Sequence, residues 1–180
     1  MIDDQSRSDQ YHEVSIMPSL IPIAIAIIRC DDRYLFLKRR NPPYENLWSM
    51  IGGKVNLGEH VREAAIREVV EETGTKQVDS YEYRGVVSER LVGVDGTLSD
   101  HFLIFVGSAE ISSFQENHRE GELALFSAEE VTELSDQFLP SDLHMFNCFR
   151  ERSVSSQLYE AELEHENGTY RLRYYRKAPD

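Results

Sequence analysis

The sequence has little positive charge, few cysteines and no long hydrophobic run. It has 32 Asp and Glu residues and only 19 Lys and Arg residues, which gives a formal net charge of −13 over 180 residues. This balance argues against wholesale binding to nucleic acid or to an anionic membrane surface, because both require a basic footprint. Small phosphorylated substrates remain compatible with it if local basic residues or metal ions offset the field.

The two cysteines, Cys30 and Cys148, form no metal-binding or disulfide spacing, so we expect a reduced, cytoplasmic setting. The longest apolar run, Leu20–Ile28, contains Pro22 and is far shorter than the roughly 20 residues that span a bilayer. It predicts a buried strand and no membrane partner. The polar, acidic N-terminus does not have the pattern of a signal peptide.

The length and the 41% hydrophobic content favour one domain with a substantial core. We expect a loose tail over residues 1–15 and a single domain over 16–180, which includes a C-terminal helix and hairpin. Strands are predicted at 22–29, 34–40, 47–51, 83–91, 101–107 and 122–127. The first of these should be buried on both faces.

Turn and cap signals complete the outline. Gly52-Gly53 is expected to start a turn into a helix over 60–73, which Gly74 should end in a left-handed conformation. Ser127 and Glu130 form a capping box for a short helix, and another helix is predicted near 141–152. Asn167-Gly168 predicts a terminal hairpin. Strands and helices interleave, and short hairpins imply antiparallel pairs, so a mixed sheet between helices fits best.

The helix over 60–73 carries an unusual group of acids. At about 100° per residue its apolar side chains fill an arc of roughly 180° that should face the core: Val61, Ala65, Ile66, Val69 and Val70. Glu68 and Glu72 fall at the edge of that arc, and Glu71 lies about 60° further out. Partly buried like charges raise each other's pKa, and a divalent cation removes that penalty. Magnesium suits such a carboxylate group, while the alternative is a solvated acidic edge with salt bridges.

The residues upstream decide between these two interpretations. Gly53 is followed five residues later by Glu59, and after seven more residues by Arg67-Glu68-Val69-Val70-Glu71-Glu72-Thr73-Gly74. This pattern resembles the box of the Nudix hydrolase family, G-x5-E-x7-R-E-U-x-E-E-x-G-U, where U is aliphatic. Only the last position differs from this pattern, because Thr75 occupies it instead of an aliphatic residue. The resemblance implies a Nudix-type α/β/α sandwich with a mixed β-sheet over roughly Leu20–Leu134.

The resemblance also implies the site. Glu68 and Glu72 would be the principal metal ligands, Glu71 a direct or water-mediated ligand, and the Gly53 carbonyl a further ligand. Arg67 would orient Glu59 through a charge-assisted contact. The cofactor would be Mg²⁺, with Mn²⁺ as the alternative, and the reaction would be attack of water on one phosphorus of a diphosphate.

Other candidates are less specific. Glu120 and Glu122 precede or begin a late strand, where the family often has its general base, but each is equally compatible with an ordinary loop acid. Lys38, Arg39 and Arg40 end a strand that faces the same loops, so they are candidates for the substrate's phosphates. The other interpretation is a strand end whose long side chains reach solvent.

The substrate follows only in outline. The sequence motifs typical of several family subgroups are missing downstream of the box. Residues 39–48 resemble a loop of ADP-ribose and nucleotide-sugar hydrolases. We therefore expect a small nucleoside diphosphate derivative, with nucleoside triphosphates as the alternative. A non-catalytic nucleotide-binding module should have a broken glutamate set, and an isomerase needs a well-placed cysteine. Hydrolysis is the better interpretation, and a homodimer is compatible with the terminal hairpin.

Overall fold

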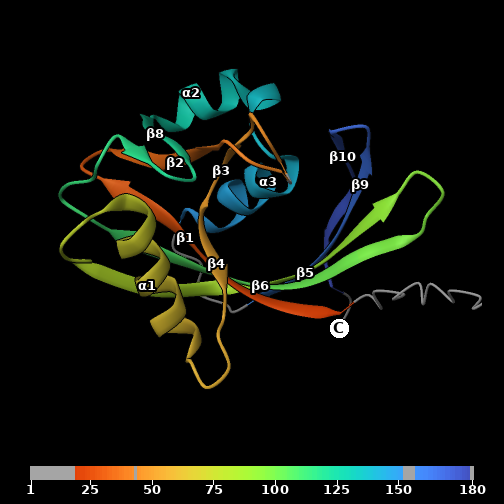
Figure 1. Cartoon of the computed structure of the whole chain (residues 1–180), viewed down its shortest axis with the longest axis horizontal. Coiled ribbons are helices and arrows are strands. Elements are labelled where there is room, and N and C mark those ends of the chain that lie inside the picture. The colour runs from red at the N-terminus through yellow and green to blue at the C-terminus, as the bar shows by residue number, and fades with distance from the viewer. Residues whose placement is uncertain (1–18, 43, 152–156, 179–180) are drawn as a thin grey trace, which may run out of the picture.

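The computed structural model describes residues 19–42, 44–151 and 157–178, so the tail expected over residues 1–15 lies outside these ranges. The elements, in chain order (Figure 1), are β1 (Leu20–Cys30), β2 (Arg33–Arg39), β3 (Trp48–Ser49), β4 (Ile51–Lys54), α1 (Val61–Thr73), β5 (Ser80–Gly93), β6 (Leu98–Glu110), β7 (Asn117–His118), β8 (Gly121–Phe126), α2 (Ala128–Glu133), the 3₁₀ turn η1 (Ser135–Gln137), α3 (Pro140–Phe149), β9 (Gln157–Glu166) and β10 (Thr169–Lys177).

Strands of the described residues form one mixed sheet in the order β10-β9-β5-β6-β1-β2-β8-β7. β1 is parallel to β6, and β5 is parallel to β9, whereas the hairpin pairs are antiparallel. The second edge of β1 is shared, because its first half pairs with β4 and its last residues pair with β2. The sheet therefore forks at β1, and β4 is the branch that leads into α1.

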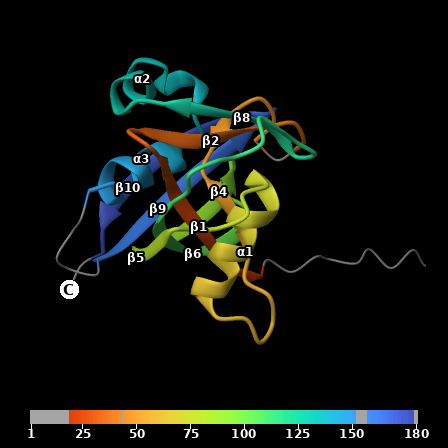
Figure 2. The same cartoon turned by 90° about the vertical axis from the view of Figure 1, so that its left-hand side faces the viewer.

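The two faces of β1 support two cores. Successive strand residues point to opposite faces, so Ile25 and Ile27 join the aromatic cluster around Phe36, while Ala26 and Ile28 pack on the side of Val69 in α1. α1 contacts β4 and β1, and α3 contacts β6 and β10. Figure 2 shows β1 between these two helices. This arrangement confirms the predicted α/β/α sandwich.

Two expectations about the strands are wrong in detail. The strand predicted at 47–51 is two short strands, β3 and β4, and Gly52 and Gly53 lie inside β4 instead of starting a turn. Both glycines pair with β1, and a Cβ on Gly52 would lie 2.3 Å from the Ala24 carbonyl oxygen. This close approach of the β1 backbone, which only glycine permits, explains Gly52. β1 is continuously buried only over 24–28, because residues 20–23 and Arg29 are more exposed, whereas Cys30 is buried.

The buried face of α1 is rotated relative to the prediction. Ala64, Ala65, Val69, Glu72 and Thr73 are its buried residues, whereas Val70 is 38% exposed. The helix is thus turned so that Glu72 lies within the buried arc and not at its edge.

The predicted helix caps and the turn of the terminal hairpin are confirmed. Gly74 ends α1 with φ 67°, and Ser127 and Glu130 form both contacts of the capping box of α2. Asn167 and Gly168 have positive φ at the turn between β9 and β10. Thr75, at the one departing position of the box, is buried, and its hydroxyl donates to the Gln77 carbonyl at 2.9 Å. No helix within the described ranges has the length and apolar content needed to cross a bilayer.

Candidate active site

Arg67 organises the carboxylates at the start of the site. Its guanidinium donates to both oxygens of Glu59, from Nε at 2.8 Å and from Nη2 at 3.0 Å, and from Nη1 to Glu68 at 2.6 Å. It also donates to the Lys54 carbonyl at 3.1 Å, which ties α1 to the end of β4. The contact with Arg67 is the largest cause that lowers the pKa of Glu59 to about 2. The predicted contact between Arg67 and Glu59 is present, and Glu68 shares it.

Glu72 is held in a different environment from the other acids of α1. It is 5% exposed, and its Oε2 has no hydrogen-bond partner in the part of the chain that the structure describes. Burial, followed by the charges of Glu120 and Glu68, raises the pKa of Glu72 to about 9, and the positive charge of Arg39 opposes this shift. Buried oxygens without partners are costly. This carboxyl is therefore placed for a positively charged group.

Gly53 brings β4 against the carboxylates. A Cβ at this position would lie 2.4 Å from Glu68 Oε1, so the Glu68 carboxylate occupies the space that any other side chain would need. Glu68 is 14% exposed at its side chain, while Glu71 is 54% exposed and its contact with Arg67 is 3.3 Å long. The structure thus places Gly53, Glu68 and Glu72 at one inner site, with Glu71 on its solvent side.

The two candidate glutamates near β8, Glu120 and Glu122, lie in different surroundings. Glu120 lies beside Glu72, where its charge and a hydrogen bond raise the pKa of Glu72. Glu122, two residues further on, is exposed on β8 opposite Lys38 and lines another hollow with Arg33 and Phe114. Only Glu120 joins the carboxylates of α1.

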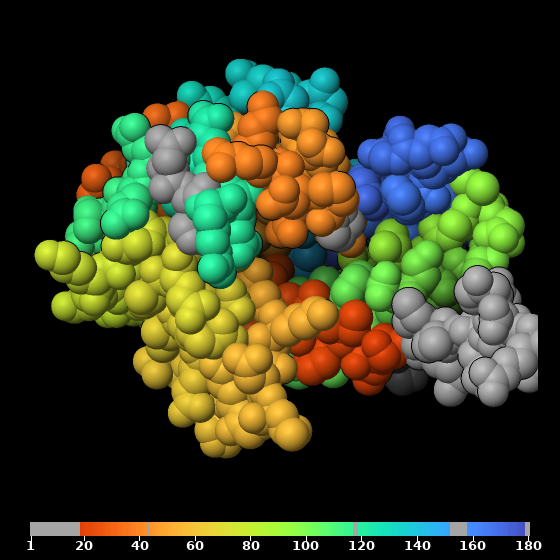
Figure 3. Space-filling model, viewed as in Figure 1, coloured from red at the N-terminus to blue at the C-terminus, as the bar shows by residue number. Residues whose placement is uncertain are grey.

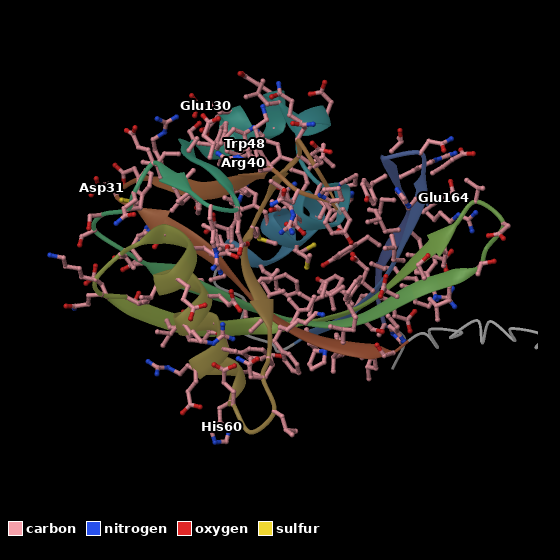
Figure 4. The ribbon with its side chains drawn as sticks, in the orientation of Figure 1. Asp31, Arg40, Trp48, His60, Glu130 and Glu164 are labelled. Atoms are coloured by element: carbon pink, nitrogen blue, oxygen red, sulfur yellow. The ribbon has the colours of Figure 1, made fainter. Side chains whose placement is uncertain are left out.

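The three basic residues at the end of β2, Lys38, Arg39 and Arg40, also lie in different surroundings. Arg39 acts on both Glu72 and Asp142, which places it between the carboxylates of α1 and the pocket described below. The Lys38 ammonium lies 5.6 Å from the centre of the buried Trp48 ring. The exposed Arg40 donates its backbone N–H to the Glu120 carbonyl at 2.9 Å. Figure 4 shows Arg40 at the end of the molecule formed by β2 and β8, far from His60 at the first turn of α1.

A pocket of about 370 Å³ opens beside Gly53. Figure 3 shows this face hollowed between the segment near residues 40–50, the hairpin of β5 and β6, and β1. Its lining includes Gly52 and Gly53, Arg39 and Tyr44, and apolar side chains that include Ile23, Phe102, Ile104 and Met145. It also includes Glu89 and Asp142, which the sequence analysis did not select. Glu89 occupies one alternating position of a strand and Asp142 the first turn of a helix, and neither pattern distinguishes them from ordinary acids.

The acidic group fits a divalent cation by its chemistry. As the side chains stand in the described ranges, no three Asp, Glu, His or Cys converge as a ready ligand set. However, Glu68, Glu72 and Glu120 supply carboxylate oxygens, and one oxygen of Glu72 is buried without a partner. Hard cations such as Mg²⁺ and Mn²⁺ take oxygen ligands of this kind.

Comparison with known proteins agrees with this geometry. Residues 20–148 match the NUDIX domain family. Over 48 residues the chain is 46% identical to an ADP-ribose pyrophosphatase of Methanocaldococcus jannaschii, a match that covers 27% of this chain and 28% of that protein. Over 137 residues it is 23% identical to an RNA pyrophosphohydrolase of Campylobacter jejuni, covering 71% and 87% of the two chains.

Solved structures share the fold. A mutator MutT protein from Bacillus halodurans superposes with a TM-score of 0.68 at 25% identity, covering 89% of this chain and 99% of that one. A bifunctional NMN adenylyltransferase/ADP-ribose pyrophosphatase from Francisella tularensis, in complex with AMP and a manganese ion, superposes with a TM-score of 0.58 at 16% identity. That match covers 74% of this chain and 42% of the other.

Proposed function

The chain belongs to the Nudix hydrolase family, and we propose that it is a metal-dependent enzyme that cleaves the diphosphate linkage of a nucleoside diphosphate derivative of ADP-ribose or nucleotide-sugar type. The family match over residues 20–148 gives the hydrolase class. The type of substrate and the requirement for a metal ion are what we propose beyond that class.

The observation that carries the metal requirement is the buried Glu72 oxygen without a partner, beside Glu68 and Glu120. Glu68 and Glu72 would hold the ion, with Glu71 reaching it directly or through water and the Gly53 carbonyl as a further ligand. Mg²⁺ is the proposed ion, and Mn²⁺ is the alternative. When bound, such an ion polarises phosphoryl oxygens and lowers the pKa of the attacking water.

The chain's own residues would position the reacting groups. Arg67 holds Glu59 and Glu68 with a fork of hydrogen bonds, so Glu68 keeps a fixed orientation. Arg39 lines the pocket, and its positive charge acts on both Glu72 and Asp142, so we assign it to the phosphates. Glu120 is the proposed general base because it lies beside Glu72. Lys38, Arg40 and Glu122 have less support, since the first packs on Trp48 and the other two are exposed.

The size and position of the pocket support a nucleoside-containing substrate. Ligand pockets of about 300–1,000 Å³ are typical for small molecules, and this pocket of about 370 Å³ begins at Gly53, which touches Glu68. A diphosphate at the glycine end would leave the nucleoside in the pocket. The 46% identity over 48 residues to an ADP-ribose pyrophosphatase favours the same substrate type.

Nucleoside triphosphates are the second candidate. A 40% identity over 50 residues to a putative 8-oxo-dGTP diphosphatase of Bacillus subtilis, which covers 28% of this chain and 32% of that protein, favours them. Both candidates are small nucleotides, which the net charge of −13 also favours over nucleic acid.

A phosphate-release panel tests the proposal. ADP-ribose, nucleotide sugars, nucleoside triphosphates and 5′-triphosphorylated RNA are incubated with Mg²⁺, with and without alkaline phosphatase. We expect phosphate from ADP-ribose or a nucleotide sugar only when phosphatase is present. Preference for triphosphates would move the chain to the second candidate, and preference for RNA would contradict both.

Glu72→Gln is the matched variant for that panel. It removes one charge at nearly constant shape, and we expect turnover to fall by at least about 100-fold while the fold is kept, as judged by circular dichroism. Full activity of this variant would overturn the role given to Glu72. The cytoplasmic setting and the homodimer remain predictions, and light scattering after size-exclusion chromatography tests the latter.

A further inference from the structure

Two acidic side chains lie within the pocket and take no part in the metal or phosphate chemistry proposed above. Glu89 comes from β5 and Asp142 from the first turn of α3. They are 3% and 8% exposed, and both line the pocket. Buried acids are rare unless they are paired or functional, so their presence in this cavity requires an explanation.

The fold satisfies Asp142 but not Glu89. Asp142 Oδ2 accepts a hydrogen bond from the Met50 backbone N–H at 2.7 Å, and the charge of Arg39 stabilises its ionised form. Ser141 opposes the rise in the pKa of Glu89, but Glu89 Oε2 has no hydrogen-bond partner within the described ranges. A polar ligand group in the pocket would satisfy this oxygen.

The walls of the pocket indicate which kind of group enters. Apolar side chains such as Ile23, Phe102 and Ile104 line it. Such walls suit a flat nucleobase better than a ribose, whose hydroxyls would be left without partners. The glycines lie on β4 and Glu89 lies on β5, and β1 and β6 separate these two strands in the sheet. A Cβ on Gly53 would meet the Glu68 carboxylate. A nucleotide would therefore have its phosphates at the glycines and its base towards Glu89.

We propose that Glu89, supported by Asp142, selects the base of the substrate by hydrogen bonding to its exocyclic amine. This inference rests on the proposed function, since it assigns the specificity of the same site. Adenine, guanine and cytosine have an exocyclic amine, and hypoxanthine and uracil do not. Substrates with one of the first three bases should therefore be preferred.

The protonation of Glu89 favours adenine or cytosine over guanine. Burial, followed by the charge of Asp142, raises the pKa of Glu89 to about 8, so this carboxyl is neutral at pH 7. A neutral carboxyl has one O–H donor and one free acceptor. Adenine and cytosine offer the matching pair, because in each the amine donates and the adjacent ring nitrogen accepts. Guanine presents two neighbouring donors, which match an ionised carboxylate instead.

The test compares two substrates that differ mainly at that amine. kcat/KM is measured for ADP-ribose and for its hypoxanthine counterpart, inosine diphosphate ribose. We expect the wild type to prefer ADP-ribose by at least about 10-fold, since a buried group left unpaired in the complex weakens binding by that order. In Glu89→Ala the preference should fall to about 2-fold or less. Glu89→Gln should keep it, because an amide also offers one donor and one acceptor.

Glu82→Gln is the control on the same strand, since its side chain is 45% exposed and lies outside the pocket lining. It should leave both substrates unchanged. A wild type that does not distinguish the two substrates, or a Glu89→Ala variant with the preference intact, would overturn the assignment of Glu89.

Equilibrium binding separates this inference from the proposed function. The affinities of AMP and IMP are measured by calorimetry with Mg²⁺ for the wild type and for Glu89→Ala, a comparison that needs no turnover. A preference for AMP that Glu89→Ala removes supports base selection even if the phosphate-release panel is negative. Equal affinities in the wild type reject it even if ADP-ribose is hydrolysed. Guanosine nucleotides bound more tightly than adenosine nucleotides would retain the amine contact and reject the pairing with adenine.

Discussion

Replacing Glu89 by glutamine should stabilise the protein at alkaline pH and leave its stability nearly unchanged at acid pH. Burial first, and then the charge of Asp142, raise the pKa of Glu89 to about 8 in the folded chain, against an ordinary value of 4.5. Between these two values the unfolded chain has released the proton that the folded chain still holds. The stability present below pH 4.5 is therefore lost as the pH rises towards 8.

The size of this loss follows from the width of the interval. Each pH unit costs about 1.4 kcal/mol, and an interval of about 3.5 units gives an upper limit of about 5 kcal/mol. Glutamine has nearly the same shape and does not titrate. The variant should therefore keep several kcal/mol of unfolding free energy that the wild type loses by about pH 9.

Urea unfolding at about pH 5, 7 and 9 measures the effect. The fluorescence of Trp48 reports it, because this is the single tryptophan of the chain and it is buried. Glu82→Gln, with its half-exposed carboxyl on the same strand, should change the unfolding free energy by less than about 0.5 kcal/mol. If the wild type and Glu89→Gln lost stability in parallel from pH 5 to pH 9, the buried titration of Glu89 would be refuted.

Three further outcomes are expected. Gly53→Ala places a methyl group 2.4 Å from Glu68 Oε1, so the carboxylate must shift, and kcat should fall by about 100-fold while the melting temperature changes little; unchanged kcat in steady-state assays would contradict the close fit. Phe36→Ala removes a ring that packs edge-on against Phe126, Phe138 and Phe146, and it should cost about 3–5 kcal/mol in urea unfolding; a loss below about 1 kcal/mol would argue against that cluster as the centre of the core. Chelation by EDTA should abolish turnover, and excess Mg²⁺ should restore it, whereas activity that persists in EDTA after exhaustive dialysis would rule out the metal requirement.

The sequence was most informative where structure is determined locally. The helix, its Gly74 cap, the Ser127 capping box and the Asn167-Gly168 turn all depend on neighbouring residues, and each is where it was predicted. The spacing of the Nudix box likewise identified residues that share one helix and the strand before it. These features need no knowledge of distant pairing.

Features set by distant pairing were harder to predict. Gly52 and Gly53 resemble turn residues, but the pairing of β4 with β1 makes them strand residues. Glu120 and Glu122 have the same local character, and only the path of the chain into β8 brings Glu120 to Glu72. Glu89 and Asp142 are separated by 52 intervening residues, and their joint burial depends on the packing of α3 against the sheet.

The contact between the loop after β2 and the terminal hairpin has a consequence for how this protein can diversify. Tyr44, which lines the pocket with φ 70°, donates its backbone N–H to the Tyr170 hydroxyl at 3.3 Å, and the two rings lie 4.6 Å apart. Tyr170 belongs to β10, beyond the residues that match the family. The carboxylates of α1 and the support of the pocket rim are thus encoded in separate parts of the chain. Changes in the hairpin can reshape what the pocket accepts without altering the carboxylates, so substrate range and bond-breaking chemistry are free to evolve independently.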